Sequence, residues 1–211
     1  LDELPEFAKT TLESMRQPME DGIINITRVA GTVSYSCSFM LVCAMNPCKC
    51  GYFGSDDREC TCSPMARKRY LDKISGPLLD RIDIEIELPR VSYDDISGKT
   101  KAGEPSEKIR ERVNFAREFA RKRLEKLGAK RNVLNADMTG DLFRKCCKPD
   151  VEGEELMREA FDALGLSARG HDRVLRVART IADLEGSESI TADHIAEAIM
   201  YRSLDRKYWR S

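Results

Sequence analysis

The 211-residue sequence predicts an α/β segment followed by an all-α domain. Two observations support this prediction. Short apolar runs separated by turn residues occupy residues 1–90, and apolar residues recur with helical spacing throughout residues 106–211. The stretch between them, 91–105, is poor in apolar residues, and we expect it to be a linker.

The first part of the α/β segment combines an acidic strand end with a helix. Asp2 and Glu3 follow Leu1 as they would follow the last residue of a strand, and Pro5 suits the first turn of a helix. Apolar residues then recur at helical spacing to about Arg16, and we expect Pro18 to end this helix.

Four β-type runs follow. A hairpin is predicted at 22–37, where Ile23–Val29 and Thr32–Tyr35 flank Ala30-Gly31. Phe39–Met45 is apolar on both faces, as is typical of a central parallel strand. Between residues 82 and 88 isoleucine and leucine alternate with acidic residues, which predicts a half-exposed strand at a sheet edge.

The C-terminal half has the start and stop signals of helices. One long helix is predicted to end at Gly128, Ser167 is expected to cap a helix that reaches Glu185, and Thr191 is expected to cap the last one. Residues 107–131 hold ten Lys or Arg against four Glu. A solvated helix face explains this excess as well as a nucleic-acid-binding stripe does.

Composition and charge exclude several classes of protein. Hydrophobic residues make up 41% and charged residues 34%, which is too apolar for a disordered chain and too charged for a membrane protein. Acidic residues near the start occupy the place of a signal peptide's positive charge. We therefore expect a cytoplasmic protein with no membrane partner. The net charge of −1 gives no general attraction to nucleic acid.

Four cysteines gather in a loop at 47–63 that is rich in Gly, Asp and Ser. Cys48-x-Cys50 and Cys60-x-Cys62 provide four thiolates, which is enough for a closed tetrahedral Zn²⁺ site. The spacing within each pair is tighter than the usual C-x₂-C, so two disulfides or four free thiols remain alternatives. A zinc ion here would fold the loop rather than take part in catalysis.

Several motifs in fixed order resemble one protein family. They are Leu1-Asp-Glu-Leu-Pro-Glu-Phe7, Arg16-Gln-Pro-Met-Glu-Asp-Gly22, Ala44-Met-Asn-Pro-Cys-Lys-Cys-Gly-Tyr52, Ser75-Gly-Pro-Leu-Leu-Asp-Arg81, Ser167-Ala-Arg169 and Val177-Ala-Arg-Thr-Ile-Ala-Asp-Leu184. The sequence resembles the magnesium-chelatase-like AAA+ ATPases, in their competence-associated bacterial branch. Typical chelatase subunits lack the cysteine insert, which favours this branch. The resemblance implies a partial AAA+ αβα core, whose parallel sheet lacks its first strands, followed by a helical lid domain.

The resemblance also implies roles for single residues. Asp2 and Glu3 correspond to the Walker B pair, with Asp2 serving Mg²⁺ and Glu3 orienting the hydrolytic water. Asn46 corresponds to sensor 1. Arg81 corresponds to the arginine finger that stabilises the phosphoryl transition state in a neighbouring subunit, and Arg169 corresponds to the sensor 2 arginine. A surface or packing salt bridge is the alternative for each arginine.

The sequence departs from the family in one respect. The Walker A loop, G-x-x-x-x-G-K-[ST], does not occur in it. We expect that this sequence is the C-terminal part of a longer protein that binds ATP and Mg²⁺, and that this part alone neither binds ATP tightly nor hydrolyses it. The resemblance implies a homo-oligomeric ring, expected to be a hexamer, in the full-length protein.

Three functions remain open from the sequence. The first is an ATPase that remodels DNA, with Arg28 near the tip of the hairpin as a candidate contact to a DNA phosphate. The second is the ATPase subunit of a metal chelatase. The third is a zinc-stabilised nucleic-acid-binding or regulatory module without an ATPase role.

Overall fold

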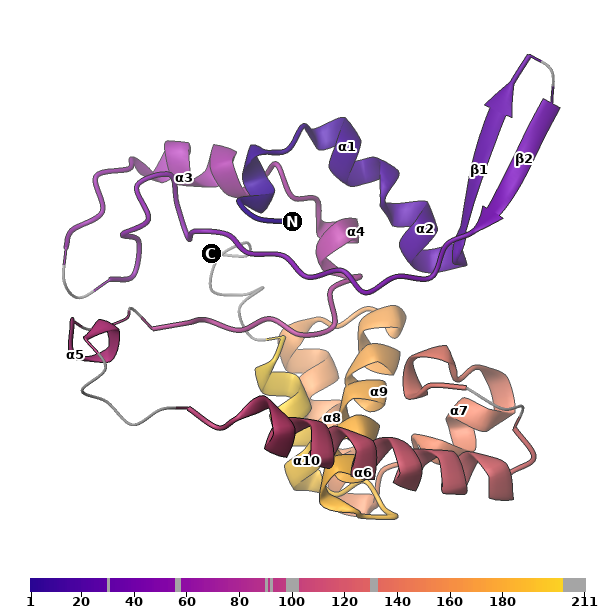
Figure 1. Ribbon diagram of the computed structural model, residues 1–211. Helices are drawn as coiled ribbons and strands as arrows, with labels where there is room; N and C mark the ends of the chain where they lie inside the picture. Colours follow the sequence, from indigo (N-terminus) through magenta and orange to yellow (C-terminus); the bar gives the residue numbers. More distant parts are fainter. Residues whose placement is uncertain are drawn as a thin grey trace. The chain divides into compact units, whose positions relative to one another are not determined.

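The structure is a computed structural model that describes residues 1–29, 31–55, 58–89, 91, 93–97, 103–129 and 133–202. Two compact units can be distinguished, one of Leu1–Ile82 and one that begins at Asp83 (Figure 1). Each unit has its own apolar core. None of the helices in the described ranges is long and apolar enough to cross a membrane.

The first unit contains short helices and one hairpin. Its elements are the 3₁₀ turn η1 (Leu4–Glu6), α1 (Lys9–Ser14), α2 (Arg16–Asp21), β1 (Ile23–Arg28), β2 (Gly31–Ser36), α3 (Pro64–Leu71) and α4 (Gly76–Leu79). Pro18 does not end a helix, as the sequence had indicated, but lies within the first turn of α2, where its missing N–H group is not needed. Leu12, Ile74 and Leu78 form the centre of the core.

The hairpin lies within the predicted range 22–37. Its strands are antiparallel and pair from Ile23 with Ser36 to Arg28 with Gly31. Every described residue of β1 and β2 is exposed, and Figure 1 shows the hairpin extending away from α1 and α2. A hairpin of two strands without packing partners is marginally stable by itself in water.

The run Phe39–Met45 is extended but is not buried on both faces as expected. Met40 and Val42 are largely exposed. Among the described residues, the ladder bonds of this run go to the segment Leu1–Leu4, on one side of the run. A strand is buried on both faces only when neighbouring strands and covering helices are in place, which explains the difference.

The prediction of a half-exposed edge strand between residues 82 and 88 is wrong about which side chains are buried. Ile84, Ile86 and Leu88 are exposed, whereas Glu85 is half-buried and donates its N–H to the carbonyl oxygen of Tyr201 at 2.7 Å. The described part of the chain offers this segment no strand to pair with, so the alternation of side chains does not select a buried face.

The second unit is helical. Its elements are α5 (Tyr93–Ile96), α6 (Ser106–Lys126), the 3₁₀ turn η2 (Asn135–Asp137), α7 (Gly140–Cys146), α8 (Val151–Leu164), α9 (Ala168–Glu185) and α10 (Ala192–Met200). The single turn α5 falls within the predicted linker, of which positions 92 and 98–102 lie outside the described residues.

Capping determines where the helices of this unit begin. The hydroxyl of Ser167 accepts the N–H of Gly170 at 3.0 Å at the start of α9. At the start of α10, Nδ1 of His194 accepts the N–H of Thr191 at 2.9 Å. Since Nδ1 is an acceptor, the proton of the neutral ring lies on Nε2, which donates to Glu185 at 2.9 Å. Both helices therefore begin where the sequence predicts.

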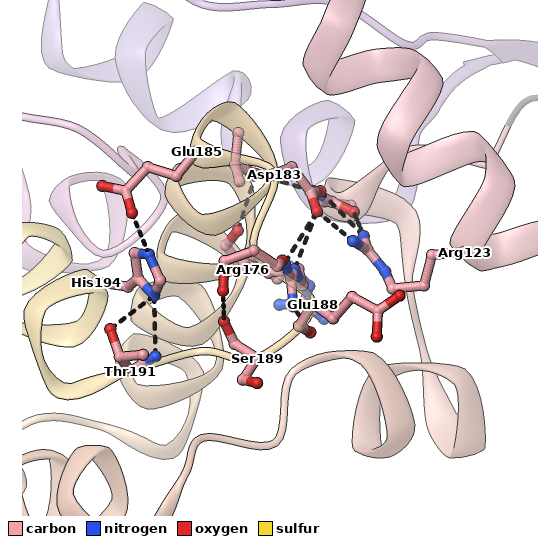
Figure 2. A network of polar contacts seen from close by, with 12 residues as sticks. Arg123, Arg176, Asp183, Glu185, Glu188, Ser189, Thr191 and His194 are labelled. Carbon is pink, nitrogen blue, oxygen red and sulfur yellow. Dashed lines mark hydrogen bonds and ion pairs between the residues drawn. The ribbon is translucent and has the colours of Figure 1, made fainter.

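A polar network joins α6, η2 and α9. Arg179 and Asp183 are each 1% exposed, and Asp183 accepts hydrogen bonds from Arg123, Asn135 and Arg179. The Arg179 guanidinium also donates to the carbonyl oxygens of Ser187 at 2.5 Å and Glu188 at 2.8 Å. Figure 2 shows Arg123 reaching Asp183 from the neighbouring helix. Pairing and hydrogen bonding offset the cost of burying these charges, so the loss of either partner would leave the other uncompensated.

Candidate nucleotide site and metal centre

Asp2 and Glu3 lie beside the end of the extended run that leads to Asn46. The Leu1 amino group donates to the carbonyl oxygen of Val42 at 2.8 Å, and the N–H of Ala44 donates to the carbonyl oxygen of Leu1 at 2.9 Å. These two bonds have the pattern of a parallel ladder. Parallel strands end at the same edge, so the carboxylates that follow Leu1 and the amide of Asn46 belong to one edge of the first unit.

The backbone at Glu3 is strained. Its φ is 51° and its ψ is 49°, and among the described residues it is the only non-glycine residue with a positive φ. The Glu3 N–H donates to a carboxylate oxygen of Asp2 at 2.9 Å, which supports this conformation. Conformations of this kind cost about 1–3 kcal/mol and gather at active sites. The sequence carries no signal for this strain.

Tyr70 of α3 lies near this edge. Burial raises the pKa of its hydroxyl, and the negative charges of Glu6, Cys48 and Glu3 raise it further, whereas a backbone hydrogen bond from Asn46 lowers it. Asn46 is therefore a hydrogen-bonded neighbour of Tyr70, and Glu3 is close enough for its charge to act on the hydroxyl. The ladder sets Asp2, Glu3 and Asn46 at one edge of the first unit, and their catalytic roles stay predictions.

Arg81 belongs to the same unit but points into it. It is 6% exposed, its Nη1 donates to the carbonyl oxygen of Pro77 at 2.5 Å, and its Nη2 is ion-paired with Glu20 of α2. The hydroxyl of Ser75 accepts the N–H of Leu78 and caps the short helix α4, which ends two residues before Arg81. Glu20 has no signal in the sequence, because an ion pair across 61 residues has no local signature.

Arg169 belongs to the second unit. It is the second residue of α9 and is exposed. The capping bond of Ser167 at the same helix start keeps this turn of α9 in place. Arg28 is the last residue of β1 and is exposed beside the tip of the hairpin.

Two arginines of the basic segment 107–131 are ion-paired at the surface of α6. Arg121 of α6 is paired with Glu118 and Glu125, and Arg112 is paired with Glu104. These pairings satisfy arginines that a binding stripe would present to phosphates. Positions 130–132 lie outside the described residues.

The four predicted zinc ligands lie together. The Sγ atoms of Cys48, Cys50, Cys60 and Cys62 are all within 4.8 Å of one another. The separations are 3.4 Å between Cys48 and Cys50, 3.6 Å between Cys48 and Cys60 and 3.5 Å between Cys50 and Cys60. A tetrahedron with Zn–S bonds of 2.3 Å has edges of about 3.8 Å. The four cysteines are free thiols, so this group could hold zinc.

The loop backbone points at the sulfur atoms. A backbone hydrogen bond from Tyr52 lowers the pKa of Cys50 to about 5, and a further one from Thr61 acts in the same direction. Cys62 also receives a backbone hydrogen bond, from Cys50, but burial and its neighbouring thiols raise its pKa to about 11. Four adjacent thiols oppose each other's ionisation, and a divalent cation removes this opposition.

Two arginines pack on the aromatic residues of the same loop. The guanidinium of Arg58 lies 4.7 Å from the ring centroid of Tyr52, and that of Arg67 lies 4.4 Å from the ring centroid of Phe53. Arg67 also donates to the carbonyl oxygen of Cys62 at 2.8 Å. These contacts connect the two cysteine pairs to each other and to α3. Cation–π pairs of this kind have no signature in the spacing of residues along the sequence.

Comparison with known proteins identifies the family. The sequence profile of the magnesium chelatase subunit ChlI matches residues 1–96, and that of the C-terminal part of the same subunit matches residues 103–202. An uncharacterized protein of Escherichia coli strain K12, YifB, is 40% identical over 98% of the chain. The competence protein ComM of Haemophilus influenzae is 38% identical over 98% of the chain, and an uncharacterized protein of Mycobacterium tuberculosis is 39% identical over 96%.

The chain spans 39% of the length of each of these relatives. Both halves of the chain match parts of one chelatase subunit, in the order in which the two parts occur here. The chain belongs to the magnesium-chelatase-like family, among the proteins related to ComM.

Proposed function

We propose that this chain is the portion of an AAA+ ATPase that runs from the Walker B residues through the helical lid, and that the full-length protein couples ATP hydrolysis to remodelling of a partner. The observation that carries the proposal is the parallel ladder between Leu1 and the run Val42–Ala44, since Asp2 and Glu3 follow the first of these segments and Asn46 follows the second. Family membership supports the same function.

The donors at this edge fit a magnesium nucleotide. Carboxylate and amide oxygens are ligands that Mg²⁺ accepts, with the remaining positions filled by water and phosphate. Mg²⁺, when bound, neutralises charge on the phosphates. In this proposal Asp2 holds the ion, Glu3 orients the attacking water, and Asn46 orients that water or the γ-phosphate. Arg81 and Arg169 contribute positive charge to the transferred phosphoryl group.

The experiment is ATP hydrolysis by the full-length protein with Glu3→Gln. The amide keeps the shape of the side chain but cannot act as a base, so we expect the rate to fall about 100-fold or more, with ATP binding retained. Glu6→Gln is the matched control, since Glu6 lies in the same 3₁₀ turn and pairs at the surface with Lys73 at 3.6 Å. Equal rates for Glu3→Gln and wild type would contradict the proposal.

DNA is the partner that we propose for the full-length ring. The relation to a competence protein and the exposed hairpin with Arg28 beside its tip support this choice. Contacts to phosphates imply that DNA affinity falls as salt rises. Mg²⁺ insertion into a porphyrin in the presence of partner subunits would instead identify a chelatase.

We also propose that the cysteine cluster binds one structural Zn²⁺. The four thiols supply the complete set of ligands, which leaves no open position for a substrate. Cys48 is fully buried two residues after Asn46, so an ordered loop supports the position of Asn46.

A further inference from the structure

The candidate arginine finger is held inside its own subunit. Both ends of the Arg81 guanidinium contact the same chain, one at the carbonyl oxygen of Pro77 and the other at the carboxylate of Glu20. Only 6% of the residue is exposed. An arginine that acts on a nucleotide in another subunit must present its guanidinium at the surface. Arg81 therefore has to leave this position before it can act.

The ion pair lies beside an open cavity, which gives Arg81 a path outward. The cavity has a volume of about 300 Å³ and is lined by Glu13, Arg16, Gln17, Glu20, Asp21 and Arg81. The Glu20 side chain is 36% exposed there. None of the residues that line the cavity belongs to the apolar core around Leu78.

Glu20 also lies at the base of the hairpin. It is in the last turn of α2, which Gly22 ends with a φ of 64°. Ile23, the first residue of β1, follows directly, and the carbonyl oxygen of Gly22 accepts the N–H of Cys37 at 2.7 Å. A displacement of the exposed hairpin thus reaches the helical turn that carries Glu20.

We propose that Glu20 holds Arg81 in an inactive orientation, and that Arg81 acts on the neighbouring nucleotide only after this ion pair separates. The proposal rests on the proposed role of Arg81 as a finger in trans. The Glu20 end of the pair is 36% exposed, so water can solvate the charges as the pair separates, and we expect the held and released states to differ little in free energy. A small change in the pair therefore shifts the population between them.

Glu20→Gln in the full-length protein tests the proposal. The substitution removes the charge and keeps the shape, so more of Arg81 is released, and we expect kcat for ATP hydrolysis to rise about threefold with an unchanged KM for ATP. Glu20→Ala removes the same charge, is expected to give the same increase, and replaces the glutamine variant if that variant folds poorly. Glu13→Gln is the control, because Glu13 lines the same cavity but pairs with Arg16, at 2.7 Å.

Arg81→Ala distinguishes the finger role of Arg81 from its restraint by Glu20. We expect this variant to lose most of its hydrolysis and to gain none when Glu20→Gln is added. If Glu20→Gln is no faster than Glu13→Gln, or accelerates hydrolysis in the Arg81→Ala background as well, Glu20 does not restrain Arg81. If Arg81→Ala hydrolyses ATP at the wild-type rate, the finger role fails and the restraint by Glu20 fails with it.

Discussion

At the scale of single residues, the chemistry of this chain depends on strain and on charge placement. Glu3 keeps a left-handed backbone next to Asp2, and Arg81 keeps its charge buried against Glu20. Neither feature has a local sequence signature. The ladder from Leu1 and the cysteine cluster, by contrast, follow from residue types and spacing that can be read directly.

The cysteine cluster leads to a prediction at this scale. Cys60→Ser removes one of four ligands, and we expect the purified protein to lose its stoichiometric zinc because a closed tetrahedral site needs all four. Elemental analysis of the metal content measures this directly. Cys37→Ser is the control, since Cys37 is a free thiol outside the cluster and should leave one zinc per chain. A folded wild-type protein that contains no zinc would contradict the assignment.

At the scale of elements, the hairpin and the helices of the second unit were predictable, whereas the burial of the other extended segments was not. The caps at Ser167 and Thr191 and the glycine after α9 are local signals, and the helices begin and end there. Burial of an extended segment depends instead on partners that are distant in sequence. The run Phe39–Met45 and the segment from Ile82 to Leu88 therefore have the predicted extended character without the predicted burial.

The link between α6 and α9 gives the second prediction. Asp183→Ala removes the carboxylate that pairs with Arg123 and Arg179 and leaves a buried guanidinium without its charge partner. We expect the free energy of unfolding to fall by about 3–5 kcal/mol. Chemical denaturation measures the change.

Asp141→Ala is the matched control for this prediction. Asp141 also pairs with an arginine, Arg144, but both side chains are largely exposed. We expect its effect to stay within about 0.5 kcal/mol, because exposed ion pairs contribute little. Similar losses for Asp183→Ala and Asp141→Ala would show that burial of the network does not determine its contribution.

At the scale of the whole molecule, the proposed nucleotide site is shared between subunits. The chain spans 39% of the length of its relatives, and the phosphate-binding loop does not occur within it. In the proposed ring, Glu3 of one subunit and Arg81 of the next act on the same nucleotide, so hydrolysis needs both residues. The family could be recognised from the order of the motifs, whereas the inward position of Arg81 required the structure.

The most direct measurement is ATP hydrolysis by a mixture of two full-length variants, Glu3→Gln and Arg81→Ala, co-assembled in equal amounts. Each variant alone is expected to be nearly inactive. A mixed ring places an intact Arg81 from one variant against an intact Glu3 from the other at about a quarter of its interfaces, so we predict recovery of about a quarter of the wild-type rate. A mixture that remains as inactive as its separate components would contradict a site built from both subunits.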